Sequence, residues 1–146
     1  MENNQVALSS EIISKLIEEA LFMRTRSYIL YSKFAVGAAL LTGSGRIYGG
    51  CNIENAAYPV TICAERTAMV KAVSEGEREF RAIAVAGGRE KCPEIYSYPC
   101  GTCRQFMREF CDSSTFVVIT AKSTEDYKIF TLEELLPYSF GPESLI

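Results

Sequence analysis

Three cysteines constrain the fold of this chain more than any other feature of its sequence. Cys63 begins the run Cys-Ala-Glu-Arg, and Cys100 and Cys103 form a Cys-x-x-Cys pair. Three thiolates can hold a zinc ion and leave its fourth tetrahedral position open for water, whose pKa the metal lowers towards ~7. We therefore expect a fold that brings Cys63 to the later pair, with Glu65 as the group that carries protons there.

The absence of histidine from the 146 residues narrows the chemistry further. It excludes mechanisms that need an imidazole base, such as the Ser-His-Asp and Cys-His arrangements. It also leaves Cys, Asp and Glu as the side chains that can bind zinc. The net charge of -3, from 15 Lys+Arg and 18 Asp+Glu, argues against nucleic acid as the main partner, because nucleic-acid-binding domains usually carry a basic face.

The six cysteines would suggest disulfides in a secreted protein. Residues 1–10, however, have neither the basic nor the apolar region of a signal peptide. No apolar run reaches the ~20 residues that a transmembrane helix needs. We therefore expect a cytoplasmic protein without membrane contact, whose reduced thiols are available for metal or redox chemistry.

The pattern of apolar residues predicts a single α/β domain over residues 1–146. Helices are expected over residues 9–30, 62–74, 101–110 and 132–136, and strands over residues 36–41, 46–51, 80–86, 115–120 and 126–130. The candidate ligands fall where loops enter helices, and a helix N-terminus lowers the pKa of a thiol. Cys100 and Cys103 share one face of a helical turn, whereas Cys63 and Glu65 can serve one site only at a helix end.

Other interpretations of the cysteines remain open. Cys51, Cys92 and Cys111 are typical small core residues. Cys92 lies in an expected loop, and as a fourth thiolate it would close the site and make the zinc structural. A Cys-x-x-Cys pair is also a redox motif, but redox use leaves Cys63 and Glu65 unexplained.

Four further side chains can be interpreted either as ordinary surface, loop or core residues or as parts of a functional site. Zinc with three thiolates carries a formal charge of -1, which Arg66 would offset by donating hydrogen bonds to the sulfurs. Asn52 and Glu54 are common loop residues, yet together they form a donor and an acceptor suited to sugar hydroxyls. Phe34, taken alone, is more typical of a core than of a ligand-stacking ring.

These stretches resemble the zinc-deaminase signature, in the variant that has three cysteines and a glutamate that is not a ligand. More narrowly, the chain resembles the small homotetrameric cytidine deaminases. The resemblance runs from about residue 10 to the C-terminus and rests on residues 34–41, 50–59, 62–68, 99–105 and 134–142.

The resemblance implies a three-layer αβα fold with a mixed five-stranded sheet and one zinc per subunit. Cys63, Cys100 and Cys103 would bind that zinc, with Arg66 against them as charge compensation. The implied reaction is the hydrolysis of cytidine and 2′-deoxycytidine to uridine and 2′-deoxyuridine, which releases ammonia and belongs to pyrimidine salvage. A zinc-activated hydroxide would attack C4 of the ring while Glu65 shuttles protons.

The resemblance also implies how the nucleoside is held. Phe34 would stack on the base, and the backbone at Ala64 would bind the pyrimidine. Asn52 and Glu54 would bind the ribose 3′-hydroxyl.

The same resemblance implies that subunits complete one another's sites, because Tyr58 and Phe140 would each reach the pocket of a neighbouring chain. Three features depart from the family. Ala35 stands where proline is frequent, Thr61 stands where glycine is frequent, and residues 87–98 differ. We expect these departures to affect affinity and substrate preference rather than the class of reaction.

Three rival functions share parts of this pattern. A deaminase of cytosine in nucleic acid would need a basic surface to hold the strand. A deaminase of a cytosine-containing antibiotic would not need Asn52 and Glu54, which favour a free ribose. A structural zinc module that binds a partner would need a fourth protein ligand, for which Cys92 is the candidate.

Overall fold

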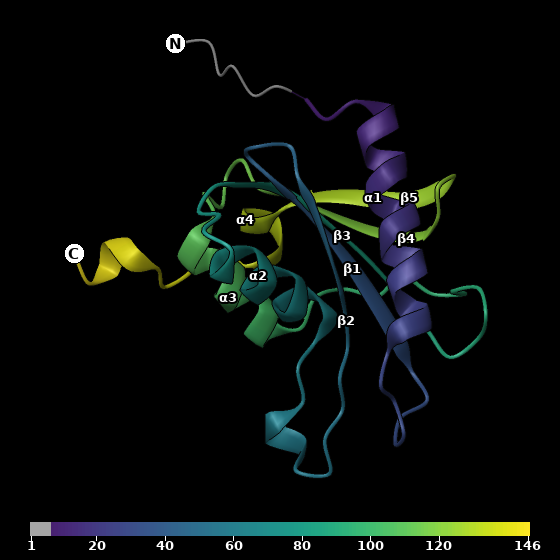
Figure 1. Cartoon of the computed structure of the whole chain (residues 1–146). Coiled ribbons are helices and arrows are strands. Elements are labelled where there is room, and N and C mark those ends of the chain that lie inside the picture. Colours follow the sequence, from purple (N-terminus) through teal and green to yellow (C-terminus); the bar gives the residue numbers. More distant parts are fainter. Residues whose placement is uncertain (1–6) are drawn as a thin grey trace.

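The computed structural model describes residues 7–146 of the chain (Figure 1). The expectation that residues 1–10 are not a signal peptide falls partly on residues 1–6, which lie outside the described residues. Within residues 7–146, no helix combines the length and the apolar character needed to cross a bilayer.

One sheet of five strands forms the centre of the fold, in the order β2-β1-β3-β4-β5. Its strands are β1 (Ala35–Thr42), β2 (Ile47–Cys51), β3 (Phe80–Gly88), β4 (Val117–Ser123) and β5 (Asp126–Thr131). The helices are α1 (Ser10–Met23), α2 (Ala64–Ser74), α3 (Gly101–Phe110) and α4 (Leu132–Leu135). Only β3 and β4 pair in parallel, and the other three pairs are antiparallel, so the expected mixed sheet is confirmed.

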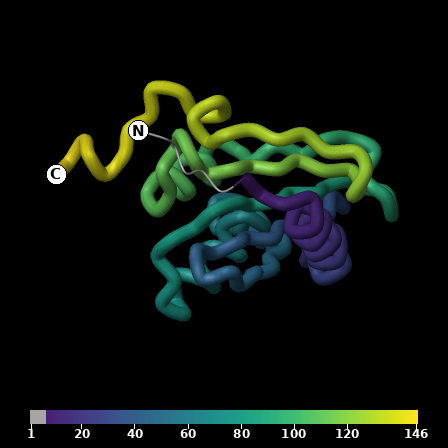
Figure 2. Tube along the Cα trace, turned by 90° about the horizontal axis from the view of Figure 1, so that it is seen from above, coloured from purple at the N-terminus to yellow at the C-terminus, as the bar shows by residue number. Residues whose placement is uncertain are grey.

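The helices cover both faces of the sheet and make three layers (Figures 1 and 2). Side chains alternate between the two faces along a strand. Ala38 and Leu40 of β1 therefore pack with α2 and α3, whereas Ala39 and Leu41 pack with α1. The two apolar clusters fix the positions of α2 and α3, whose first turns contain the candidate metal ligands.

A glycine in β2 allows the start of α2 to lie directly on the sheet. A Cβ atom on Gly50 would lie 2.4 Å from the carbonyl oxygen of Ala64 and 2.5 Å from the amide nitrogen of Ala68. Any larger residue would push the first turn of α2 away. The first turn of α2, which follows Cys63 and includes Glu65, therefore packs directly against β2 at Gly50.

The helix expected over residues 9–30 ends at Met23, so the prediction is wrong for residues 24–30. Arg24 turns inward and donates hydrogen bonds to the carbonyl oxygens of Ala35 and Gly88, at 3.1 and 3.0 Å, and to those of residues 90 and 91. The Thr25 hydroxyl donates to the carbonyl of Phe22 at 2.7 Å, which satisfies a helix C-terminus. Hydrogen bonds from the side chains of residues 24 and 25 therefore hold the backbone where the regular helix ends.

Other element boundaries differ from the expected ones by a few residues. The helix predicted from residue 62 begins at Ala64, because Ile62 pairs with Ile53 in an isolated β-bridge and Cys63 is extended. The strand predicted over residues 115–120 covers residues 117–123 instead, because the amide of Phe116 bonds the carbonyl of Asp112 in a turn.

Candidate metal centre and pocket

Three thiols converge where two helices begin. Cys63 is the N-cap residue of α2, Cys100 is the N-cap residue of α3, and Cys103 lies in the first turn of α3. Their sulfur atoms all lie within 4.8 Å of one another, with 3.8 Å between the sulfurs of Cys63 and Cys100. Tetrahedral zinc with bonds of ~2.3 Å requires sulfurs about 3.8 Å apart, so the spacing fits zinc. In the part of the chain that the structure describes, Cys92 is exposed and outside this cluster.

The electrostatics of the cluster favour a bound cation. A hydrogen bond from the Cys103 thiol lowers the pKa of Cys63 to about 5, although burial acts in the opposite direction. The pKa of Cys103 is raised, because its proton is held in that hydrogen bond and because the thiol is buried. The N-termini of two helices add partial positive charge that favours thiolates. A metal ion that binds here takes the place of the shared proton.

Glu65 is buried beside the cluster without being part of it. Its side chain is only 4% exposed, and its Oε2 atom lies 3.7 Å from the sulfur of Cys103. Burial raises the pKa of Glu65 to about 7, and the charge of Cys63 acts in the same direction. Glu65 therefore lies next to the three thiols but is not one of the three residues that form the cluster.

Arg66 contacts the cluster through Cys63. Its Nη2 atom donates to the sulfur of Cys63 at 3.6 Å and to the carbonyl oxygen of Thr61 at 3.5 Å. A guanidinium in this position offsets the negative charge that three thiolates accumulate. The expected hydrogen bond from Arg66 to a sulfur of the cluster is present, and the role of Arg66 in charge compensation stays a prediction.

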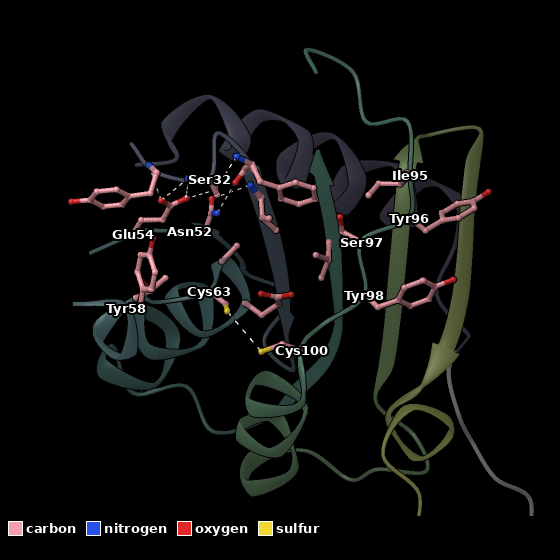
Figure 3. Close-up of a pocket in the computed structure, with 17 residues that line it drawn as sticks. Ser32, Asn52, Glu54, Tyr58, Cys63, Ile95, Tyr96, Ser97, Tyr98 and Cys100 are labelled. Atoms are coloured by element: carbon pink, nitrogen blue, oxygen red, sulfur yellow. Dashed lines mark hydrogen bonds between the residues drawn. The ribbon is translucent and has the colours of Figure 1, made fainter. Parts of the chain in front are cut away.

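A cavity of about 750 Å³ opens onto the cluster (Figure 3). Its lining comes from residues 31–36 at the start of β1, residues 52–65 around the start of α2, residues 95–100 before α3, and Val85 of β3. Figure 3 shows Ser32, Asn52 and Glu54 on one wall and the segment 95–98 on the other, with Cys63 and Cys100 between them. A small molecule that enters the cavity therefore meets the polar groups of the first wall and, between the two walls, the thiols.

Hydrogen bonds fix the position of the Glu54 carboxylate on the wall that also contains Ser32 and Asn52. The backbone amides of Tyr31 and Ser32 donate to it at 3.0 and 3.1 Å, and the Ser32 hydroxyl also donates to it. These bonds, the Ser32 hydroxyl first, lower the pKa of Glu54. Glu54 is therefore an ionised acceptor, and a carboxylate has lone pairs to spare for a sugar hydroxyl.

Asn52 fixes the backbone that presents Phe34. The side-chain oxygen of Asn52 accepts from the amide of Val36 at 2.9 Å, and its Nδ2 donates to the carbonyl of Phe34 at 2.8 Å. The preceding residue, Lys33, has a φ of 59°, so a left-handed turn directs the chain into β1. The Asn52 amide keeps one further N–H donor for a ligand.

Of the eleven predicted site residues, eight line this cavity and three do not. Phe34, Asn52, Glu54, Ala64 and Glu65 line it together with Cys63 and Cys100. Tyr58 lies at its edge, 72% exposed, with its ring 6.2 Å from that of Tyr31. Phe140 is 59% exposed and is not part of the lining of its own chain's cavity. Cys103 belongs to the thiol cluster and Arg66 contacts it, but neither is part of the lining.

Two parts of the lining were missed by the sequence analysis. Ser32 lies between the helix expected over residues 9–30 and the strand expected over residues 36–41 and has no expected role, and residues 95–98 fall in the stretch 87–98 that differs from the family. Neither stretch carries a motif or a periodicity. Their place in the cavity comes from contacts with residues distant in the sequence, such as the bond of Ser32 to Glu54.

The chain shares extensive similarity with known proteins. A family model described as the cytidine and deoxycytidylate deaminase zinc-binding region matches residues 10–120. The cytidine deaminase of Sporosarcina psychrophila is 49% identical over 133 residues, covering 91% of this chain and 94% of that protein. The cytidine deaminase of Halalkalibacterium halodurans is 45% identical over 130 residues, covering 89% and 95%.

The fold is also that of a solved relative. The crystal structure of cytidine deaminase from Burkholderia pseudomallei superimposes with a TM-score of 0.78 at 42% sequence identity, covering 86% of this chain and 97% of that chain. The residues matched by the zinc-binding region include all three thiols of the cluster. The chain therefore belongs to the cytidine deaminase family, and its three thiols are the family's zinc site.

Proposed function

We propose that this protein hydrolyses cytidine and 2′-deoxycytidine to uridine and 2′-deoxyuridine, with release of ammonia, in the pyrimidine salvage of the cytoplasm. Residues 1–146 would act as a single catalytic domain. The observation that supports the proposal best is one cavity that holds the zinc thiols, the buried Glu65 and, on its wall, Asn52 and Glu54. The relatives named above as cytidine deaminases agree with it.

The chain's own groups can carry out the proton transfers. Zinc held by Cys63, Cys100 and Cys103 would, when bound, activate a water molecule for attack on C4 of the ring. Glu65 accepts one proton from the water and delivers it to N3 of the ring. Glu65 then carries the second proton to the departing amino group, so the C4–N bond breaks and ammonia leaves. One C–O bond is formed for each C–N bond broken.

The remaining lining residues orient the nucleoside. Phe34 would stack on the base, and Asn52 and Glu54 would bind the 3′-hydroxyl of the ribose. Ala64 is the first residue of α2, where backbone N–H groups have no partner within the helix. Its amide is therefore a donor suited to the pyrimidine.

We further propose a homotetramer in which Tyr58 and Phe140 complete the pocket of a neighbouring chain. Both side chains are large, aromatic and exposed, at 72% and 59%. The backbone around Phe140 is held against α3, where its carbonyl oxygen accepts a hydrogen bond from Gln105 Nε2 at 2.9 Å. The C-terminal end of the chain then extends away from the body (Figure 1).

The expected result for the assembly is a particle of four chains in light scattering. Activity per chain should fall on dilution to concentrations at which the scattering mass decreases, because each pocket then loses its neighbouring aromatic rings. A fully active monomer would contradict the proposed role of Tyr58 and Phe140.

Replacement of Arg66 by glutamine should lower kcat/KM or zinc affinity by roughly 10- to 100-fold, the effect typical for partners of metal ligands. Glutamine keeps a donor but removes the charge that offsets the thiolates. Titration of zinc against a chelator, together with steady-state rates, measures both effects. Arg46→Gln is the matched control, because Arg46 is exposed, pairs with Glu75 at 3.2 Å, and neither residue lines the cavity. Normal rate and normal zinc affinity in Arg66→Gln would refute the charge-compensation role.

The substrate class is tested by ultraviolet absorbance during incubation with cytidine, 2′-deoxycytidine and a cytosine-containing single-stranded oligonucleotide. We expect both nucleosides to be converted and the oligonucleotide to remain intact, because the cavity offers Asn52 and Glu54 to a free sugar. Conversion of the oligonucleotide alone would show that the protein acts on nucleic acid. A cytosine-containing antibiotic as the only substrate would likewise overturn the proposal.

A further inference from the structure

Ser97 lines the cavity, and its buried side-chain oxygen has no hydrogen-bond partner among the described residues. Among the described residues, the buried side-chain nitrogen and oxygen atoms that lack a hydrogen-bond partner are Arg66 Nε, Ser97 Oγ and Thr120 Oγ1. Of these three residues, Ser97 alone lines the cavity. Leaving a buried hydroxyl unpaired destabilises a fold, so such a group in a cavity points to a ligand that pairs with it.

The surroundings of Ser97 place its hydroxyl next to the ring of Phe34. A Cβ atom on Gly87 would lie 2.5 Å from Ser97 Oγ and 3.0 Å from Phe34 Cε1. Both side chains therefore approach the same point over β3, and only glycine leaves room for them. Figure 3 shows Ser97 on the wall across the cavity from Ser32 and Asn52.

We propose that the Ser97 hydroxyl hydrogen-bonds the pyrimidine base of the bound nucleoside and contributes to substrate selection. This inference rests on the proposed function. Asn52 and Glu54 occupy the opposite wall and are assigned to the sugar, while Phe34, the neighbour of Ser97, is assigned to the base. A serine hydroxyl both donates and accepts, and the base carries hydrogen-bonding atoms on its edge. The contact is therefore to the base and is independent of the 2′-hydroxyl.

The chain offers a matched pair of variants for the test. Ser97→Ala and Thr120→Val each remove one buried hydroxyl that has no partner, but Thr120 is not part of the cavity lining. Neither variant loses a hydrogen bond of the free protein, so both should have the Tm of the parent or a slightly higher one. Both should also keep their full zinc content.

The decisive readout is kcat/KM for cytidine and for 2′-deoxycytidine. Ser97→Ala should lose about 5- to 10-fold for both nucleosides, the range for one uncharged hydrogen bond, mostly through a higher KM. Thr120→Val should match the parent. A Ser97→Ala value within twofold of the parent would overturn the inference, as would a loss confined to one of the two sugars. If parent and Thr120→Val both fail to convert cytidine, the proposed function itself is wrong.

Discussion

Glu65→Gln should retain its zinc and lose about 10²- to 10⁴-fold in kcat for cytidine, the range over which general acid–base groups act. Glutamine has nearly the same shape but cannot accept a proton from water or deliver one to N3. Glu65 is 4% exposed and lies beside the thiols without being one of the zinc ligands, so the metal has no reason to leave. Steady-state rates and zinc content per chain measure the two effects on the same preparation.

A second glutamate provides the control. Glu109→Gln removes the same carboxylate from an exposed position on α3 and should behave as the parent. Turnover near the normal level in Glu65→Gln would exclude Glu65 as the proton carrier. Loss of zinc from Glu65→Gln would show that the carboxylate is a ligand, which would contradict the three-thiol site.

Cys103→Ala should lose both zinc and turnover. The Cys103 sulfur is fully buried between Cys63 and Glu65, and its removal leaves two thiolates for the metal. We expect zinc affinity to fall by more than the roughly 10- to 100-fold that follows loss of an outer partner. Competition with a chelator gives the affinity, and the cytidine assay gives the rate.

The chain contains a matched thiol for comparison. Cys92 is exposed and outside the cluster, so Cys92→Ala should keep normal zinc content and normal turnover. If Cys92→Ala lost the metal, four thiolates would surround it, and the interpretation as a structural zinc module would return. Retention of tight zinc by Cys103→Ala would show that the cluster is not the binding site.

The members of the cluster could be predicted from the sequence, because each lies in a short motif and because an open zinc site with three thiolates links Cys63 to a pair that begins 37 positions later. Cys100 and Cys103 share one helical turn, and the requirement that Cys63 and Glu65 serve one site placed both at a helix end. The structure confirms this, with α2 beginning directly after Cys63. The absence of histidine then made thiolates the natural zinc ligands.

The end of α1 could not be predicted, because its cause is distant in the sequence. Arg24 ends the helix by reaching the carbonyl oxygens of Gly88 and of residues 90 and 91, which are more than 60 positions away. Capping and periodicity patterns involve only neighbouring residues, so they cannot predict contacts of this kind. The same holds for Ser97, whose burial against Phe34 depends on how β3 and the segment before α3 pack.

The second-subunit roles of Tyr58 and Phe140 remain predictions, since their basis is the resemblance and their exposure in one chain. The contacts of Asn52 add something that the motif did not predict. Its amide binds the backbone of Phe34 and Val36, so the same residue assigned to the sugar also positions the ring assigned to the base.

The central claim is that zinc held by three thiols, with Glu65 beside it, converts a pyrimidine nucleoside. Its most direct test is the release of uridine and ammonia from cytidine by the zinc-loaded protein, by the same protein after removal of zinc with a chelator, and after zinc is restored. We expect equal amounts of uridine and ammonia, loss of both on removal, and recovery with one zinc per chain. Full activity in the zinc-free protein, or no ammonia from the zinc-loaded protein, would contradict the account.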